Sequence, residues 1–157
     1  MSFLRFLMFL SLIVWIGGLI FFPVVAQTAF SVLPTRNLAG MIVGRSLTIL
    51  HWMAIASGII FLISSLIYNR LTTSSMHAFG ARHILICLML LLTLISQFGI
   101  IPRMNALKAS MPAEIDAVPL DNPARVQFDA LHIWSTKIEQ GVLVLGLVLI
   151  YIAAQVK

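Results

Sequence analysis

Four long apolar stretches leave this chain few folds other than a bundle of membrane-spanning helices. They run over about residues 4–29, 46–68, 84–101 and 130–154, and the breaks between them are polar or contain Pro and Gly. A helix that crosses the hydrocarbon core of a bilayer needs roughly 20 mostly apolar residues. Because a spanning backbone must satisfy its own hydrogen bonds, we predict an all-α, integral membrane four-helix bundle.

The composition argues against the other broad classes of protein. Hydrophobic residues make up 61% of the 157 positions and charged residues only 10%, whereas a soluble domain carries about 25% charged residues. The Lys and Arg residues are scattered at the ends of apolar runs and form no basic stripe, so we expect the lipid bilayer and no nucleic acid as a partner. The single cysteine, Cys87, excludes an internal disulfide.

Capping residues and prolines indicate where the helices begin and bend. Thr35 is a good N-cap for the second helix, and Asn122 followed by Pro123 is a strong start signal for the fourth. Pro23 and Pro102 are expected to bend the first and third helices. We therefore predict one domain over residues 1–157, with helices at about 3–30, 36–69, 78–108 and 123–155.

Two pairs of glycines suggest places where helices pack closely. Gly40 and Gly44 form a GxxxG pair at the start of the second helix, a spacing that allows close contact between helices. The adjacent Gly17 and Gly18 are expected to let the first helix approach a neighbour.

The distribution of basic residues bears on orientation. Four crossings place both termini on one face of the membrane, with four Lys and Arg residues on that face and six on the other. This difference does not separate the two orientations by the positive-inside rule. Arg5 immediately precedes the first apolar run, which favours cytoplasmic termini. That run is long for the apolar region of a signal peptide, so we expect the first helix to be retained. We predict a multi-pass protein of the inner (plasma) membrane.

Ionisable residues inside the apolar stretches are the first candidates for function, because such groups are costly in a membrane. His51 lies about two turns after Arg45, and His132 lies in the first part of the fourth helix. Both helices start on the same face of the membrane, so the two histidines are expected at similar depth. Glu139 lies within the fourth stretch, with Lys137 and Arg45 as possible partners.

Helical spacing groups other polar residues around these three. On the fourth helix, His132, Ser135, Thr136 and Glu139 share one face. Thr48 and His51 share a face of the second helix, and a bundle that joined the two faces would hold two imidazoles, a carboxylate and hydroxyls in one pocket. The further polar residues expected around this pocket are Thr48, Ser135, Thr136, Gln97, Arg45 and Arg103, and Gln97 is expected to form an interhelical hydrogen bond.

Three interpretations of this pocket remain open. His51 and His132 could ligate a haem b iron or, less readily, copper, and Glu139 could join them at a metal site. Glu139 with either histidine could instead carry a proton or bind a cationic substrate. In the third interpretation, the histidines only form hydrogen bonds across the bundle, and the protein has no cofactor. We interpret His77 and His83, on the opposite face, as surface residues.

Several short motifs together resemble a known family. They are the run Trp15-Ile16-Gly17-Gly18 with Phe21-Phe22-Pro23, the turn 30–34, the entry 39–45 with His51-Trp52, and Phe128-x-x-Leu131-His132-x-x-Ser135. The chain resembles bacterial members of the transmembrane-protein-205-like family, a domain of unknown function, over nearly its whole length. Its WxGG opening is also similar to CopD-type copper-resistance proteins and to the haem-binding HemJ-type protoporphyrinogen oxidases.

The resemblance implies a four-helix membrane fold. It also adds support to the interpretations in which the protein binds haem or copper. HemJ-type proteins use a histidine of their first helix, and residues 1–30 contain none here, so only His51 and His132 correspond to candidate ligands. We expect a small membrane protein that binds haem or copper for electron transfer or redox sensing. The alternatives are a transporter or permeation protein for metal or drug-like cations that uses Glu139, and an accessory subunit of a larger complex, with homo-oligomers possible. The sequence gives no evidence for a hydrolytic enzyme.

Overall fold

The computed structural model describes residues 2–72, 80–111 and 114–155, and within them it is helical with no strand. Helices α1 (Ser2–Val32) and α2 (Arg36–Thr72) are the first two spans. The third span consists of α3 (Ala81–Ile95), a π-helical turn η1 (Ser96–Ile100) and α4 (Ile101–Ser110). A short 3₁₀ turn, η2 (Ile115–Ala117), precedes the last span, α5 (Pro123–Ala154). Each span is long and apolar enough to cross a membrane, which confirms the all-α four-helix bundle.

The predicted capping residues act as expected. Thr35 Oγ1 accepts a hydrogen bond from the backbone N–H of Leu38 at 3.2 Å. Asn122 Oδ1 accepts hydrogen bonds from the N–H groups of Ala124 and Arg125, at 2.9 and 3.4 Å. These contacts satisfy N–H groups that have no partner within the helix, and they set where α2 and α5 begin.

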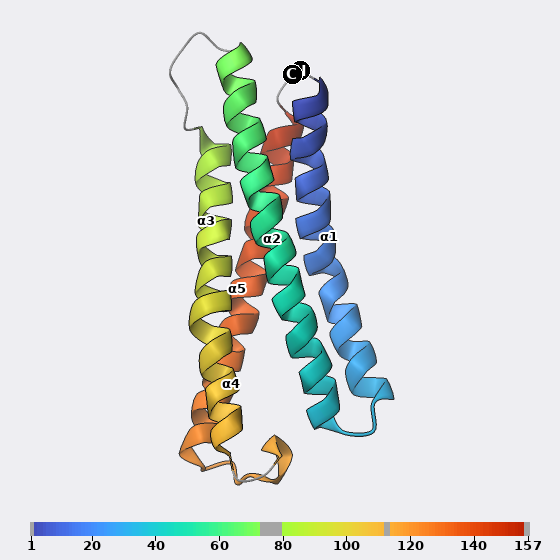
Figure 1. The fold of residues 1–157 in the computed structure, drawn as a ribbon, viewed down its shortest axis with the longest axis vertical. Coiled ribbons are helices and arrows are strands. Elements are labelled where there is room, and N and C mark those ends of the chain that lie inside the picture. Colours follow the sequence, from blue (N-terminus) through green and yellow to red (C-terminus); the bar gives the residue numbers. More distant parts are fainter. Residues whose placement is uncertain (1, 73–79, 112–113, 156–157) are drawn as a thin grey trace.

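The four spans run up and down, so the bundle has two different ends (Figure 1). At one end α1 begins and α5 ends, and we call it the terminal end. At the other, the α1–α2 connection lies near η2 and the start of α5, and we call it the loop end. Toward the loop end, α1 and α2 lean away from α4 and α5 in Figure 1.

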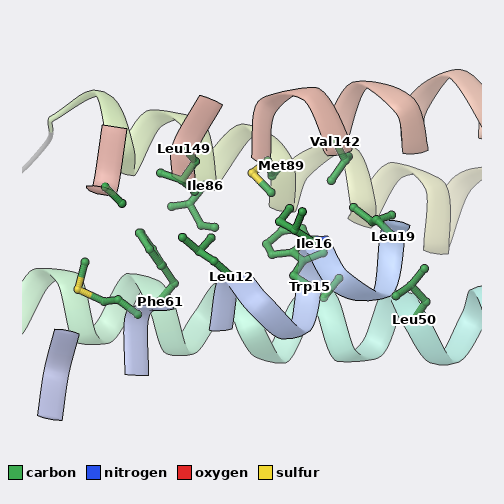
Figure 2. Packing of buried hydrophobic residues seen from close by; sticks show 13 residues of the cluster. Leu12, Trp15, Ile16, Leu19, Leu50, Phe61, Ile86, Met89, Val142 and Leu149 are labelled. Atoms are coloured by element: carbon green, nitrogen blue, oxygen red, sulfur yellow. The ribbon is translucent and has the colours of Figure 1, made fainter. Parts of the chain in front are cut away.

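The apolar core joins all four spans and lies toward the terminal end. Trp15 and Ile16 of α1 pack with Phe61 of α2, Met89 of α3 and Leu149 of α5, as Figure 2 shows. Large apolar side chains also cover the outside of the bundle, where half or more of Ile13, Trp52 and Tyr151, among others, is exposed. A bundle with an apolar exterior suits a hydrocarbon solvent, in agreement with the low content of charged residues.

The glycines predicted to allow close packing divide into two groups. A Cβ atom on Gly18 would lie 2.5 Å from Leu50 Cδ1, so α1 and α2 are in close contact there. By contrast, Gly17, Gly40 and Gly44 have no heavy atom within 4 Å of such a Cβ. The spacing of Gly40 and Gly44 allows close contact between helices, but neither glycine is in such a contact in the described part of this chain.

The two prolines in the middle of spans have different effects. Helix α1 continues through Pro23. Near Pro102, however, the third span widens into the π-helical turn, in which the N–H of Ile101 donates to Ser96 O. Proline has no N–H and its ring collides with the carbonyl four residues earlier, so a wider turn relieves the conflict that we expected to produce a bend.

Candidate proton-binding site

A histidine, a glutamate and a glutamine from three spans meet inside the bundle. His51 of α2 lies between the other two, and we call this group the His51 triad. Its Nδ1 is 2.9 Å from Gln97 Oε1 and its Nε2 is 2.7 Å from Glu139 Oε1. These distances are those of good hydrogen bonds, and the second is typical of a charge-assisted bond.

The triad is deeply buried and lies near the middle of the spans. The exposed fraction of the side chain is 1% for His51 and 14% for Glu139. Glu139 lies 16 residues after Pro123 and 15 before Ala154, which places it about 23 Å from either end of α5. A carboxyl group at this depth costs free energy unless it is protonated or paired, and here its partner is His51.

The hydrogen bonds determine which atoms share protons. With the Gln97 amide in this orientation its oxygen accepts, and this contact assigns a donating proton to Nδ1 of His51. One further proton then lies between Nε2 and the carboxyl of Glu139. It either sits on Glu139, which donates to a neutral imidazole, or on His51, which as imidazolium donates to a carboxylate. In both arrangements the pair is neutral as a whole.

The π-helical turn carries the glutamine of the triad. Gln97 is the second residue of η1, and its neighbour Ser96 is fully buried with no hydrogen-bond partner for its hydroxyl. A π turn inserts an extra residue into the helix, changes which side chains face inward, and is frequent at functional sites. The interhelical hydrogen bond predicted for Gln97 is confirmed.

The structure does not bring His132 to the triad. His132 is exposed, and its ring stacks on Phe128 at 6.4 Å between centroids. It lies on the same stripe of α5 as Glu139 but seven residues earlier, or about 10 Å nearer the loop end. The expected pocket with two imidazoles at one depth is therefore wrong, because the bundle has opened where His132 lies.

The other predicted pocket residues are divided between the interior and the surface. Ser135 is buried one turn before Glu139, whereas Thr136 is exposed. Thr48 is half-buried and donates to the carbonyl of Gly44 at 3.1 Å. These three residues lie on the loop-end side of the triad. The hydrogen bonds of the His51 ring are instead made with Gln97 and Glu139.

The basic residues expected near Glu139 do not pair with it in the structure. Arg45 and Arg103 are exposed. The ammonium of Lys137 lies 5.4 Å from the centre of the Trp134 ring, in a cation–π contact. None of the ion pairs in the described part of the chain joins Glu139 to an Arg or Lys, and its partner is His51.

A second buried histidine lies toward the terminal end. His83 is fully buried, and its Nε2 lies 3.0 Å from Ser65 Oγ, while the N–H of Gly80 donates to its Nδ1 at 3.3 Å. The prediction that His83 is a surface residue is wrong, because it faces α2. Its neighbour Arg82 donates to the side chain of Asn69. His77 lies outside the described residues.

The predicted haem or metal site involves a histidine that already has hydrogen-bond partners in this structure. Both ring nitrogens of His51 already have hydrogen-bond partners, so iron or copper would have to displace Glu139 or Gln97. In the described residues, no three His, Cys, Asp or Glu side chains are arranged to hold a metal ion. Haem and copper binding therefore stay predictions, and the contact between Nε2 and Glu139 makes the pair a candidate proton-binding site.

Comparison with known proteins identifies the family of the chain. A family model described as a domain of unknown function (DUF4149) matches residues 10–113, a range that contains His51 and Gln97. No curated protein and no solved structure matches the chain. The resemblances to CopD-type, HemJ-type and transmembrane-protein-205-like proteins stay predictions. Since the match covers about two thirds of the chain, the protein belongs to the family of the domain of unknown function DUF4149.

Proposed function

We propose that this protein exchanges protons for cations across a membrane, with the His51–Glu139 pair as its binding site. The observation that carries the proposal is the 2.7 Å contact between Nε2 and Oε1, buried near the middle of the spans. Intramembrane ionisable residues are rare because they are costly, and they mark ion and proton pathways. A substrate class of metal or drug-like cations agrees with a carboxylate as the binding group.

The charge of the pair explains why a proton and a cation would compete for it. With its shared proton the pair is neutral. When that proton leaves, a neutral imidazole and a carboxylate remain, with one net negative charge in a region of low dielectric. Such a charge is strongly unfavourable without a counter-ion, so release of the proton favours entry of a cation, and uptake of a proton favours its release.

Gln97 supports this role by holding the imidazole in one tautomer. Because Nδ1–H donates to Gln97 Oε1, Nε2 faces Glu139 in every state of the pair. The ring then cannot turn its second nitrogen away when the proton moves. We assign Gln97 as a positioning residue and the pair as the group that binds the proton or cation.

We further place the protein in the inner (plasma) membrane with both termini in the cytoplasm. Four apolar spans support a multi-pass protein with its ends on one side. The overall count of Lys and Arg does not separate the two orientations, and the orientation rests on Arg5 directly before the core of the first span.

Transport into reconstituted vesicles tests the proposal. The purified chain is inserted into phosphatidylethanolamine–phosphatidylglycerol vesicles that contain a pH-sensitive dye, and ethidium or Zn²⁺ is added outside. We expect wild-type protein to release protons in response to at least one of these cations. Glu139→Gln should reduce that release to the level of empty vesicles, because an amide cannot lose the proton.

Asp129 supplies a matched control on the same helix. Its carboxylate is half-exposed near the start of α5, 3.8 Å from the Arg125 guanidinium. Asp129→Asn removes one carboxylate, as Glu139→Gln does, and should leave the proton release unchanged. Wild-type rates in Glu139→Gln, or no response of the wild type to either cation, would contradict the proposal.

A further inference from the structure

We infer that the His51 triad exchanges its proton and cation with the loop end of the bundle, and that Trp15, Gly58 and Leu90 close the route to the terminal end. The inference rests on the proposed function, because it assigns a direction of access to the same site. It follows from three observations: where the buried core lies, how α2 and α3 pair, and where the bundle is hollowed.

The buried apolar core lies on the terminal side of the triad. On α5, the buried apolar residues Val142, Leu149 and Ala153 all follow Glu139. On α3, Ile86 and Met89 are fully buried and precede Gln97, so they too lie toward the terminal end. Water that reached the triad from this end would have to cross a close-packed layer of side chains.

The pairing of α2 with α3 locates that layer. Two of the hydrogen bonds between these antiparallel spans run from His51 to Gln97 and between Ser65 and His83. The two bonds are 14 residues apart on each helix, or about 21 Å. They are thus two levels of one interface, with the triad at one level and His83 at the other.

Halfway between the two levels, α2 and α3 are in close contact. Gly58 lies midway between His51 and Ser65, and Leu90 lies midway between His83 and Gln97. A Cβ atom on Gly58 would lie 2.5 Å from Leu90 Cδ2 and 2.9 Å from Trp15 Cζ3. Since Trp15 is only 1% exposed, this contact fills the bundle between the triad and the terminal end.

The loop end is open by comparison. A groove of about 550 Å³ lies between α4 and α5, and its lining residues are Arg103, Ala106, Leu107, Gln127, Ala130 and Leu131. Arg103 is six residues from Gln97 and Leu131 is eight from Glu139, which corresponds to about 9 and 12 Å along the helices. His132, on the stripe of Glu139, is exposed at this level.

Together these observations describe a site accessible from one side. A charged guanidinium and an amide line an open groove on the loop-end side of the triad. The apolar layer of Trp15, Gly58 and Leu90 separates the triad from the terminal end, so exchange with that end requires this layer to open. The arrangement is that of one state in an alternating-access cycle.

Thiol labelling tests the direction of access without requiring transport. Single cysteines are introduced in a Cys87→Ser background in lipid nanodiscs, where both faces are reachable, and treated with a charged, membrane-impermeant thiol reagent. Thr48→Cys and Leu131→Cys report on the loop side of the triad. Ser57→Cys and Thr93→Cys report on its terminal side, where both native side chains are buried.

We expect the two loop-side cysteines to react at least about tenfold faster than the two terminal-side ones, because only a thiol in contact with water forms the reactive thiolate. Equal or faster labelling of Ser57→Cys or Thr93→Cys would overturn the inference, as would no labelling at both loop-side positions. Loop-side labelling in a protein that moves no cation would contradict the proposed function and leave the direction of access standing.

Discussion

Removing the carboxyl of Glu139 separates the structural contribution of the triad from its proposed chemistry. Glu139→Ala leaves Nε2 of His51 without its partner, in a side chain that is 1% exposed. A buried polar group without a hydrogen bond costs about 1–3 kcal/mol. We therefore expect a loss of about 2 kcal/mol in the free energy of unfolding.

The conservative variant should behave differently. In Glu139→Gln, the side-chain amide can donate to Nε2 of His51, so the hydrogen bond is kept and the cost should stay below about 1 kcal/mol. Proton release should nevertheless be lost, because the amide does not titrate. The two variants then distinguish a stabilising hydrogen bond from a proton-binding group.

Thermal unfolding in detergent measures the difference, followed by the near-ultraviolet circular dichroism of the buried Trp15. For a chain of this length, about 2 kcal/mol corresponds to a decrease in Tm of roughly 4–8 °C. Asp129→Ala is the control, because it removes an exposed carboxylate from the same helix and should shift Tm by no more than about 1 °C. A Tm for Glu139→Ala equal to that of this control would refute the reasoning.

Four further variants test the packing, a helix cap and a buried hydrogen bond. Gly58→Ala should lower the free energy of unfolding by about 1–3 kcal/mol, because the new methyl group overlaps side chains of α1 and α3. Gly44 has open space around it, so Gly44→Ala should be neutral or stabilising in the same unfolding assay. Asn122→Ala removes the N-cap of α5 and should cost about 1 kcal/mol, seen as faster hydrogen exchange in the first turn. Ser65→Ala removes the contact between the Ser65 hydroxyl and His83 Nε2 and should lower the free energy of unfolding by about 1 kcal/mol; unchanged stability would argue against that bond.

The fold could be predicted because its determinants are local. Span lengths follow from apolar runs, and the starts of α2 and α5 follow from Thr35 and Asn122, whose side chains bond to backbone groups within three residues. The effect of Pro102 was predicted as a bend, but the structure shows a π-helical turn. Local rules indicate that proline disrupts a helix, but not how neighbouring helices accommodate the disruption.

The site was only partly predictable because it depends on how the helices pair. His51, Gln97 and Glu139 could be singled out individually as polar groups in apolar spans. Their meeting depends on the rotation of three helices, which the spacing within one helix does not specify. His132 lies on the same stripe as Glu139 but is exposed, since the separation of the helices at the loop end is a tertiary property.

The burial of His83 also depends on how the helices pair. Its position beside Arg82 near the end of a span suggested a surface residue, yet it is fully buried against Ser65. A signal was present in the sequence, because the spacing of His51 to Ser65 equals that of His83 to Gln97. It becomes informative only once α2 and α3 are known to pair in that register.

The most direct test of the account is a ¹⁵N NMR measurement of the His51 ring nitrogens in nanodiscs across a range of pH, assigned by comparison with His51→Gln. The account predicts a proton on Nδ1 at every pH, held by Gln97, and an Nε2 resonance that changes with pH and changes when Glu139 is replaced by Gln. An Nδ1 without a proton, or an Nε2 resonance that is unaffected by Glu139→Gln, would contradict the claim that the two side chains share a proton within the membrane.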